Sequence, residues 1–332
     1  MVFVTGGSGL IGSFLIEALL EQGHAVKACY RNQVPALRSA AQVQWLEGDI
    51  LDPAFLRNAL AGVHYVFHCA GLVSYAPQDR ELLKQVNVEG TANIVDACLE
   101  QQDIKLCHVS SIAAVGRPKN ARVLTEESKW DAAAEHAAYA SSKYLGELEV
   151  WRGVAEGLNA VIVNPSVVLG PADWNRSSTQ LFKYVYNQNA FYTVGSANFV
   201  DVRDVVAAML QLTFSDISGE RFILNAGQMT YKEFFAQAAA CLRRKAPSVR
   251  VPPWLAEAVW RLEHARSWLT GSRPLITKDT ARVSAKSHLF SNEKVRKATG
   301  IAFRPLSETI TWSCGQLLEN ISGDKVPQGL PD

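Results

Sequence analysis

The chain has 332 residues, of which 48% are apolar, a length that suits two unequal lobes better than one core. This apolar content is typical of a folded protein and argues against a disordered one. Lys and Arg number 33 and Asp and Glu 32, so a net charge of +1 provides no field to attract nucleic acid or an anionic membrane. We therefore expect a small-molecule partner.

Two features bear on the compartment. Met1 leads directly into Val2-Phe3-Val4 and a glycine turn, without the basic and apolar regions of a signal peptide, and no run of eighteen apolar residues follows. The six cysteines are scattered without a CxxC pair, which is typical of reduced, buried thiols. We expect a cytoplasmic protein with no membrane segment.

The first half of the chain alternates short apolar runs with helical patterns. Strands are predicted at Val2–Thr5, Ala25–Tyr30, Val43–Leu46, Val63–Cys69, Lys105–Ser110 and Ala160–Asn164. Helices are predicted at Leu10–Gln22, Leu82–Glu100 and Tyr139–Trp151, and another begins at Asp52-Pro53. Strands separated by helices favour right-handed crossovers and a parallel sheet covered on both faces. The pattern predicts an α/β, doubly wound fold of the Rossmann type, which binds ligands beyond the carboxyl ends of its strands.

This rhythm ends near Pro165. A helix at Val202–Leu212 and a strand at Arg221–Leu224 are expected to return to the sheet. The later helices are predicted at Tyr231–Leu242, Trp254–Leu269 and Glu293–Thr299. We predict a dinucleotide-binding domain at 1–165 with 197–228, a smaller, mostly helical substrate lobe at 166–196 with 229–321, and a tail at 322–332.

A glycine-rich turn directly follows the first strand. Gly6, Gly9 and Gly12 in Thr5-Gly6-Gly7-Ser8-Gly9-Leu10-Ile11-Gly12 stand between that strand and the helix that begins at Leu10. The first glycine permits a tight turn, the second lets a pyrophosphate approach, and the third lets the helix pack closely. The free N–H groups of the helix then face the phosphates. The alternative is a flexible turn, which would need neither a strand before it nor a helix after it. We therefore predict a dinucleotide site.

The end of the second predicted strand bears on the choice of cofactor. A carboxylate there binds the ribose hydroxyls of NAD, whereas an arginine pairs with the 2′-phosphate of NADP. The sequence Ala28-Cys29-Tyr30-Arg31-Asn32 has an arginine and no acid, which favours NADP. The alternative is that Arg31 is a solvated surface cation and that NAD is held by other contacts.

A tyrosine and a lysine are four residues apart in Tyr139-Ala140-Ser141-Ser142-Lys143 and so share one helix face. A phenol with a pKa near ~10 is a poor base at neutral pH, and a neighbouring cation would lower that pKa. The spacing alone is common on surface helices. Together with the glycine turn upstream it becomes a much more specific signal of a tyrosine acid/base.

Taken with further motifs, the chain resembles the extended short-chain dehydrogenases/reductases, which include dihydroflavonol 4-reductases, 3β-hydroxysteroid dehydrogenases and NAD(P)-dependent epimerases and dehydratases. The resemblance covers nearly the whole chain. Its motifs are TGGSGLIG at 5–12, GDI at 48–50, HCAG at 68–71, NVEGT at 87–91, VSSIAAVG at 109–116, YASSK at 139–143, NPSVVLGP at 164–171, FVDVRDV at 199–205 and FSNEKVRKATG at 290–300.

By this resemblance Tyr139 is the general acid/base, Lys143 binds the nicotinamide ribose and lowers the tyrosine pKa, and Ser111 hydrogen-bonds the reacting oxygen. Ser110 would end the strand. Asn87 would support the site from a helix, although a capping or packing role suits it almost as well. The predicted catalytic set is Ser111, Tyr139, Lys143 and Asn87.

The resemblance also implies the cofactor contacts. Asp49 would contact adenine and Cys69-Ala70-Gly71 would pass beside the cofactor. The nicotinamide pocket would be lined by Asn164, Pro165 and Val168. The predicted cofactor-binding set is Gly6, Gly9, Leu10, Ile11, Gly12, Arg31, Asp49, Ile50, Cys69, Ala70, Gly71, Tyr139, Lys143, Asn164, Pro165 and Val168.

Other polar residues receive structural interpretations. Arg203 at the lobe junction is expected to form an ion pair with a nearby acid rather than to reach substrate. His68, His108 and His136 fit no metal-ligand spacing, so no metal site is predicted. Glu126-Glu127 resembles a family loop near the pocket, and two solvated carboxylates are the alternative.

The predicted activity is hydride transfer between NADP, or NAD, and a carbonyl or secondary alcohol, as in a dihydroflavonol 4-reductase. Trp174, Tyr186 and Phe191 fall in the segment expected to cover the substrate, which favours a ring-containing ligand. The alternatives are an NAD-dependent nucleotide-sugar epimerase and a non-catalytic NADP-binding regulator. A homodimer through the helices that contain Asn87 and Tyr139 is expected from the family.

Overall fold

The computed structural model describes residues 1–101, 103–118, 121–174, 178–252 and 288–322. Its large sheet has seven parallel strands in the order β11-β7-β5-β4-β1-β2-β3. Their bounds are β1 Val2–Thr5, β2 Val26–Tyr30, β3 Gln44–Glu47, β4 Tyr65–His68, β5 Lys105–Val109, β7 Asn159–Pro165 and β11 Glu220–Leu224. The order reverses direction between β1 and β4, so the predicted Rossmann-type fold is confirmed.

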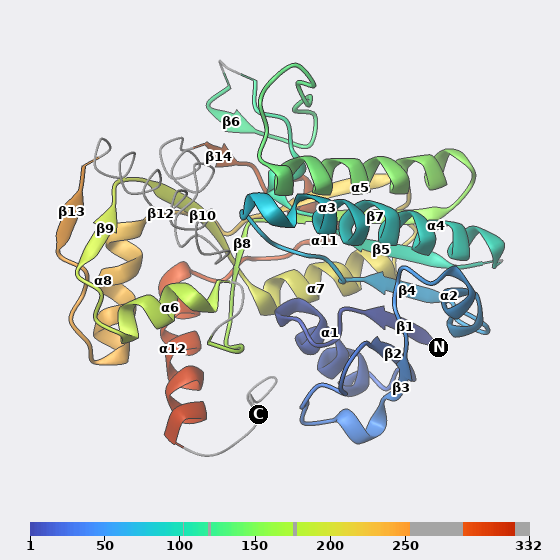
Figure 1. Ribbon diagram of the computed structural model, residues 1–332, viewed down its shortest axis with the longest axis horizontal. Coiled ribbons are helices and arrows are strands. Elements are labelled where there is room, and N and C mark those ends of the chain that lie inside the picture. The colour runs from blue at the N-terminus through green and yellow to red at the C-terminus, as the bar shows by residue number, and fades with distance from the viewer. Residues whose placement is uncertain (102, 119–120, 175–177, 253–287, 323–332) are drawn as a thin grey trace.

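Helices cover both faces of this sheet (Figure 1). On one face lie α1 Leu10–Glu21, α7 Val202–Thr213 and α11 Glu293–Thr299, and on the other lie α2 Pro53–Ala59, α4 Gly90–Glu100 and α5 Ala138–Ala155. Alternate residues of one strand enter different layers: Val4 joins the α1/α7 core, and Phe3 joins the α4/α5 core. Burying each such side chain contributes roughly 1.5–3 kcal/mol, which explains why these strands are apolar on both faces.

The helix predicted at Leu82–Glu100 is interrupted. It consists of α3 Arg80–Lys84, a π-helical turn at Gln85–Glu89, and α4. The π turn adds a residue to the helical repeat and therefore rotates the side chains that follow it. Asn87 lies in this turn and is buried.

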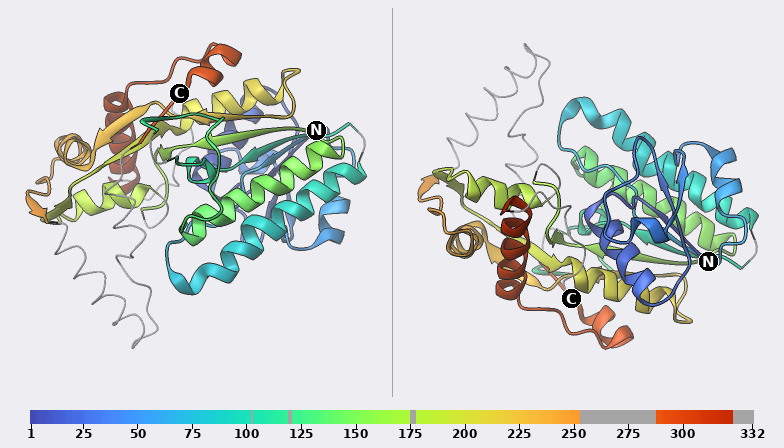
Figure 2. Two further views of the ribbon diagram at one scale, coloured as in Figure 1. Left: turned by 90° about the horizontal axis from the view of Figure 1, so that it is seen from above. Right: turned by 90° about the horizontal axis from the view of Figure 1, so that it is seen from below.

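A second group of elements lies beside the large sheet (Figures 1 and 2). Its strands are β8 Val167–Leu169, β9 Phe191–Thr193, β10 Ser196–Asp201, β12 Gly227–Thr230 and β13 Val249–Val251, and its helices are α6 Thr179–Tyr186, α8 Tyr231–Leu242 and α12 Leu306–Ser322. The core of this group includes Phe182, Phe199, Phe234 and Ile310. Helix α8 matches its predicted bounds because Thr230 and Glu233 form a capping box.

Some segments differ from the sequence-based division. Helix α11, assigned to the substrate lobe, buries Val295 in the large-sheet core, and Lys294 pairs with Glu220 at 2.9 Å. Strand β10, assigned to the dinucleotide domain, pairs with β8 and β12. A short pair, β6 Val123–Leu124 and β14 Leu289–Phe290, was not predicted. The predicted helix Trp254–Leu269 and residues 323–332 of the predicted tail lie outside the described residues.

Among the described residues, no helix combines the length and the apolar character needed to cross a bilayer.

Candidate active site

The glycine turn occupies the carboxyl end of β1, at the point where the strand order reverses. Gly6 has φ +72°, and a Cβ on it would lie 2.5 Å from the Ala70 nitrogen. A Cβ on Gly12 would lie 2.2 Å from the Gly6 carbonyl oxygen. Both positions therefore require glycine. Ser8 and Gly9 are exposed at the start of α1, where the first N–H groups of the helix have no intrahelical partner.

Arg31 and Asp49 lie together beyond the ends of β2 and β3. The Arg31 Nη1 and Asp49 Oδ2 atoms are 3.9 Å apart, and the two side chains are 66% and 40% exposed, so this ion pair is weak. Asp49 also accepts a hydrogen bond from the Leu51 N–H at 3.0 Å. Ile50 points into the core, where it meets Gly90, and its carbonyl accepts from Asn93. Its side chain therefore packs between the sheet and α4.

The loop after β4 is held against the glycine turn. Thr5 Oγ1 accepts a hydrogen bond from the Ala70 N–H at 3.1 Å and lies 2.8 Å from His68 Nδ1, while His68 Nε2 lies 3.1 Å from Thr91 Oγ1. Burial lowers the pKa of His68 to about 3, so this imidazole is neutral at physiological pH. The neutral histidine fixes the path of Cys69-Ala70-Gly71.

Tyr139 and Ser111 come together from α5 and the loop after β5. Burial raises the pKa of Tyr139, and a side-chain hydrogen bond with Ser111 opposes this effect. Ser111 Oγ also accepts from the Ala113 N–H at 3.1 Å, which fixes the serine at the start of a 3-10 turn, Ile112–Ala114. The Tyr75 ring packs edge-on against the Tyr139 ring at 5.7 Å. The serine and tyrosine predicted to act together are thus neighbours.

Lys143 is buried one turn after Tyr139 on α5. Its ammonium donates to the Val109 carbonyl at 2.8 Å, and burial lowers its pKa to about 8. The sequence predicts that Lys143 lowers the tyrosine pKa, whereas the structure shows a raised value. Burial of the phenol raises its pKa by more than the hydrogen bond with Ser111 lowers it.

Asn87 is fully engaged with the protein. Its Nδ2 donates to the Leu72 carbonyl and to Ser142 Oγ, each at 2.9 Å, and its Oδ1 accepts from the Leu72 N–H at 2.8 Å. Ser142 in turn donates to the Tyr139 carbonyl at 2.8 Å. These bonds join the loop after β4 to α5. Ser142 was not singled out in the sequence.

Asn164, Pro165 and Val168 lie on β7 and β8, at the same end of the sheet. Asn164 is fully buried and donates through Nδ2 to the Ser111 carbonyl at 3.0 Å and to Glu147. Pro165 is buried at the end of β7, whereas Val168 is partly exposed. The Asn164 side chain therefore supports the serine loop.

The other polar residues have separate roles. Arg203 pairs with Asp201 at 2.7 Å and stacks over Trp312, which confirms the expected structural ion pair. Glu126 is buried and accepts from the Ile223 N–H at 2.8 Å, so the alternative of two solvated carboxylates holds for Glu127 alone. No cluster of three or more metal-ligating side chains occurs among the described residues.

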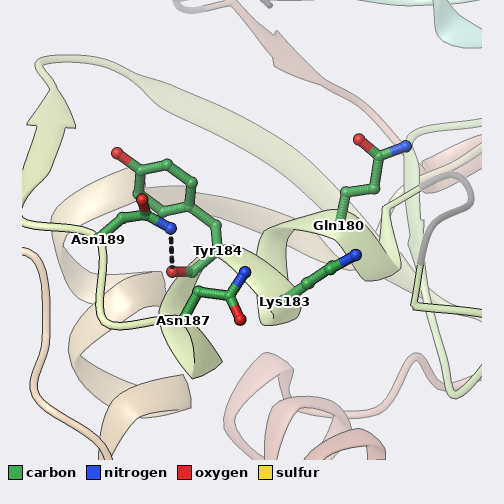
Figure 3. A pocket seen from close by; sticks show the side chains of 5 residues that line it. All are labelled: Gln180, Lys183, Tyr184, Asn187 and Asn189. Carbon is green, nitrogen blue, oxygen red and sulfur yellow. Dashed lines mark hydrogen bonds between the residues drawn. The ribbon is translucent and has the colours of Figure 1, made fainter.

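Two surface cavities lie away from these side chains. One of about 230 Å³ is lined by Gln180, Lys183, Tyr184, Asn187 and Asn189 at the end of α6 (Figure 3). The other, of about 460 Å³, lies where α1, α7 and α11 meet. None of the predicted site residues lines either one, so we place the candidate site at the sheet ends on the basis of side-chain chemistry.

Comparison with known proteins identifies the family of the chain. Residues 2–227 match the model of the NAD dependent epimerase/dehydratase family. The Synechocystis protein named "Putative dihydroflavonol 4-reductase" is 31% identical over 90% of this chain and 89% of its own length. Cinnamoyl-CoA reductase 1 of Oryza sativa is 29% identical over 93% of this chain and 88% of its own.

Among solved structures, the UDP-glucose 4-epimerase of Thermotoga maritima superposes with a TM-score of 0.78, covering 97% of this chain and 99% of its own at 17% identity. This likeness supports the fold. The family match spans both the glycine turn and the Tyr139–Lys143 pair. The chain belongs to the NAD-dependent epimerase/dehydratase family of extended short-chain dehydrogenases/reductases and is an NAD(P)-dependent oxidoreductase that acts on CH–OH or C=O groups.

Proposed function

We propose that this protein is an NADP-dependent reductase that transfers hydride between nicotinamide and the carbonyl or secondary alcohol of a small, ring-containing substrate. The observation that carries the proposal is the meeting of Tyr139 and Ser111, with Lys143 buried one turn along the same helix. A hydroxyl pair of this kind can hold a substrate oxygen while one member transfers a proton.

The glycine turn fits a dinucleotide. Because Gly6 and Gly12 have no Cβ, the turn can pack tightly against the loop after β4 and against the start of α1. The exposed start of α1 offers N–H groups to phosphate. Leu10 and Ile11 are partly exposed in this first turn. In this proposal Asp49 lies beside adenine, Gly71 beside the nicotinamide ribose, and Arg31 beside a 2′-phosphate.

The bound cofactor supplies the hydride, and the protein orients the reacting carbonyl and manages the proton. Ser111 donates a hydrogen bond to the substrate oxygen. Tyr139 donates its proton to that oxygen as negative charge develops. The raised Tyr139 pKa keeps the phenol protonated at neutral pH, which suits the reductive direction. Lys143 stabilises the phenoxide left behind.

A ring-containing substrate is supported by two observations. The Tyr75 ring already packs against Tyr139, and Trp174 packs against Tyr186 at 5.2 Å in the segment after β8. Two relatives are named for reductases of dihydroflavonol and cinnamoyl-CoA, which carry aromatic rings. An aromatic lining favours planar or cyclic ligands over extended polar ones.

The Tyr139→Phe variant tests the proposed chemistry. We expect it to retain NADPH binding, measured by cofactor fluorescence, and to lose at least about 100-fold in kcat, the usual contribution of a general acid. Tyr144→Phe is a matched control, because Tyr144 lies on the same helix and stacks against Trp130 at 4.3 Å. The assay follows NADPH oxidation with a panel of aromatic and alicyclic carbonyls. Full activity of Tyr139→Phe would refute the mechanism.

The family also supports a second candidate, an NAD-dependent nucleotide-sugar epimerase. Bound NAD would then take a hydride from the substrate and return it to the same molecule, without net change in the cofactor, while the same tyrosine and serine move the proton and hold the reacting oxygen. Such an enzyme is expected to carry NAD through purification and to act on UDP-sugars but not on free carbonyls. Arg31 favours the reductase. Cofactor bound without turnover of either substrate class would point instead to a regulator.

A homodimer is part of the same proposal. Leu82 on α3 and Leu145 and Leu148 on α5 are exposed, and these two helices pack against each other. Figure 1 shows α3, α4 and α5 together on one side of the large sheet. Exposed leucines on adjoining helices suit a self-complementary interface.

A further inference from the structure

A buried ion pair lies behind the candidate active site. Glu147 on α5 is 1% exposed, and its Oε2 accepts from Arg221 Nη1 of β11 at 3.1 Å. Arg221 is also anchored through Nε and Nη2, both of which donate to the Glu126 carbonyl. Glu126 is held in turn by the Ile223 N–H. The guanidinium therefore has a fixed position.

Glu147 connects this anchor to the site. Its Oε1 accepts from Asn164 Nδ2, and the same amide group donates to the Ser111 carbonyl at 3.0 Å. On its own helix, Glu147 lies four residues after Lys143 and therefore on the same face. The Glu147 carboxylate thus contacts Asn164, which supports the Ser111 loop, and also faces Lys143.

A buried ion pair is a costly arrangement if its only role is to stabilise the fold. Removing a carboxylate from water costs several kcal/mol in effective terms, and a buried ion pair is often matched or exceeded in stability by apolar residues of similar volume. The position of Glu147 next to Lys143 and Asn164 gives this carboxylate a role that apolar residues could not fill. We propose that Glu147, fixed by Arg221, is a positioning residue that keeps Lys143 cationic and holds the Ser111 loop in place through Asn164.

The groups around Lys143 indicate the direction of the effect. Burial lowers the Lys143 pKa to about 8, while Glu147 and Cys69 raise it. His68 on β4 and His108 on β5 also face the ammonium; their pKa values are lowered, so both are neutral at physiological pH. Burial raises the pKa of the Cys69 thiol, and that of Tyr139 is raised too, so both are protonated. Glu147 is then the charged group that favours the ammonium, and its loss lowers the Lys143 pKa.

The test titrates Lys143 directly in the cofactor-free protein, using ¹³Cε-labelled lysine and a Lys143→Arg variant to assign the signal. We expect a midpoint near pH 8 in the wild type. In Glu147→Gln the midpoint should fall by about one unit, a tenfold loss of proton affinity. Glu149→Gln is the control, because Glu149 lies on the same helix in a surface pair with Arg152 and should leave the midpoint unchanged.

A double variant separates positioning from folding. Glu147→Gln leaves Arg221 buried without its carboxylate, whereas Glu147→Gln with Arg221→Gln removes both charges. We expect the double variant to recover much of the lost thermal stability but to keep the lowered Lys143 midpoint. A midpoint equal to that of the wild type in the folded double variant would overturn the proposal and leave a purely structural pair.

The role in turnover rests on the proposed function and has its own readout. The alkaline limit of kcat should move to lower pH in Glu147→Gln by the same amount as the NMR midpoint, with little change in KM for NADPH. A kcat profile that stays in place while the midpoint moves would overturn the link to turnover. Absence of carbonyl reduction by the wild type would refute the proposed function but would leave the NMR test of Glu147 intact.

Discussion

Arg31 follows the last residue of β2 and extends beside Asp49, with 66% of its side chain exposed. A 2′-phosphate carries about two negative charges and would compete well with a single, loosely held carboxylate. We expect Arg31→Ala to weaken NADPH binding roughly tenfold, about 1.4 kcal/mol, and to change NADH binding by less than about twofold.

Fluorescence titration with the two cofactors measures this ratio. Arg57→Ala is a suitable control, since Arg57 is another exposed arginine that pairs with Glu100 on the outer helices. Equal losses for NADPH and NADH in Arg31→Ala would mean that Arg31 does not contact a 2′-phosphate. The preference for NADP would then have to be abandoned.

The sequence motifs led to Asn87 and Asn164 but not to their hydrogen-bond partners Ser142 and Glu147. Tyr139 and Lys143 share a helix face by spacing alone, so their proximity could be predicted. The bonds of Asn164 to Glu147 and of Glu147 to Arg221 join β7, α5 and β11, which are far apart along the chain. Only the spacing of Lys143 and Glu147, four residues apart on one helix, offered a signal for this network.

At the scale of elements, the close packing of α5 against the π turn determines how the site is assembled. A Cβ on Gly146 would lie 2.4 Å from the Asn87 carbonyl oxygen, so Gly146→Ala must push the two helices apart. We expect a loss of about 1–3 kcal/mol in the free energy of unfolding, the usual cost of overpacking. Because Asn87 holds Ser142 and the loop after β4, turnover should fall as well.

Gly315→Ala provides the matched comparison on α12. Gly315 is exposed and nothing lies within 4 Å of a Cβ on it, so the alanine should stabilise the helix by up to about 1 kcal/mol. Chemical denaturation of both variants measures the two changes. A Gly146→Ala protein as stable as Gly315→Ala would show that the contact between the helix and the π turn is not tight.

Elements with local signals were predicted closely, and those that depend on distant partners were not. Helices α8 and α11 have their expected bounds, because a capping box begins the first and Gly300, at φ +71°, ends the second. Helix α12 was missed: Thr309 and Ser313 stand among its buried residues, and its partner α8 lies some seventy residues earlier. The π turn likewise has no pattern that distinguishes it from an ordinary helix.

At the scale of the whole molecule, the alternation of strands and helices was enough to predict the large sheet, because right-handed crossovers leave few arrangements. The strand order places the glycine turn at the reversal between β1 and β4 and brings β5 and β7 alongside, so the ends of these four strands lie together at the centre of the site. The two-stranded sheets pair strands of two or three residues from distant segments, such as β9 with β13. Strands this short carry too few residues for a periodic signal.

The proposed dimer is tested at the same scale. A stable interface usually buries roughly 1,200–2,000 Å² in total, and the α3/α5 face would provide it through Leu82, Leu145 and Leu148. We expect the wild type to sediment at twice its chain mass of 36.4 kDa at micromolar concentration, and Leu145→Lys with Leu148→Lys to sediment as a folded monomer. Val249→Lys, which alters an exposed residue of β13, should remain dimeric.

Because the two leucines lie on the outer face of the helix that carries Tyr139 and Lys143, loss of turnover in the monomer would indicate that the partner subunit steadies this helix. A double-lysine variant that stays dimeric would place the interface elsewhere.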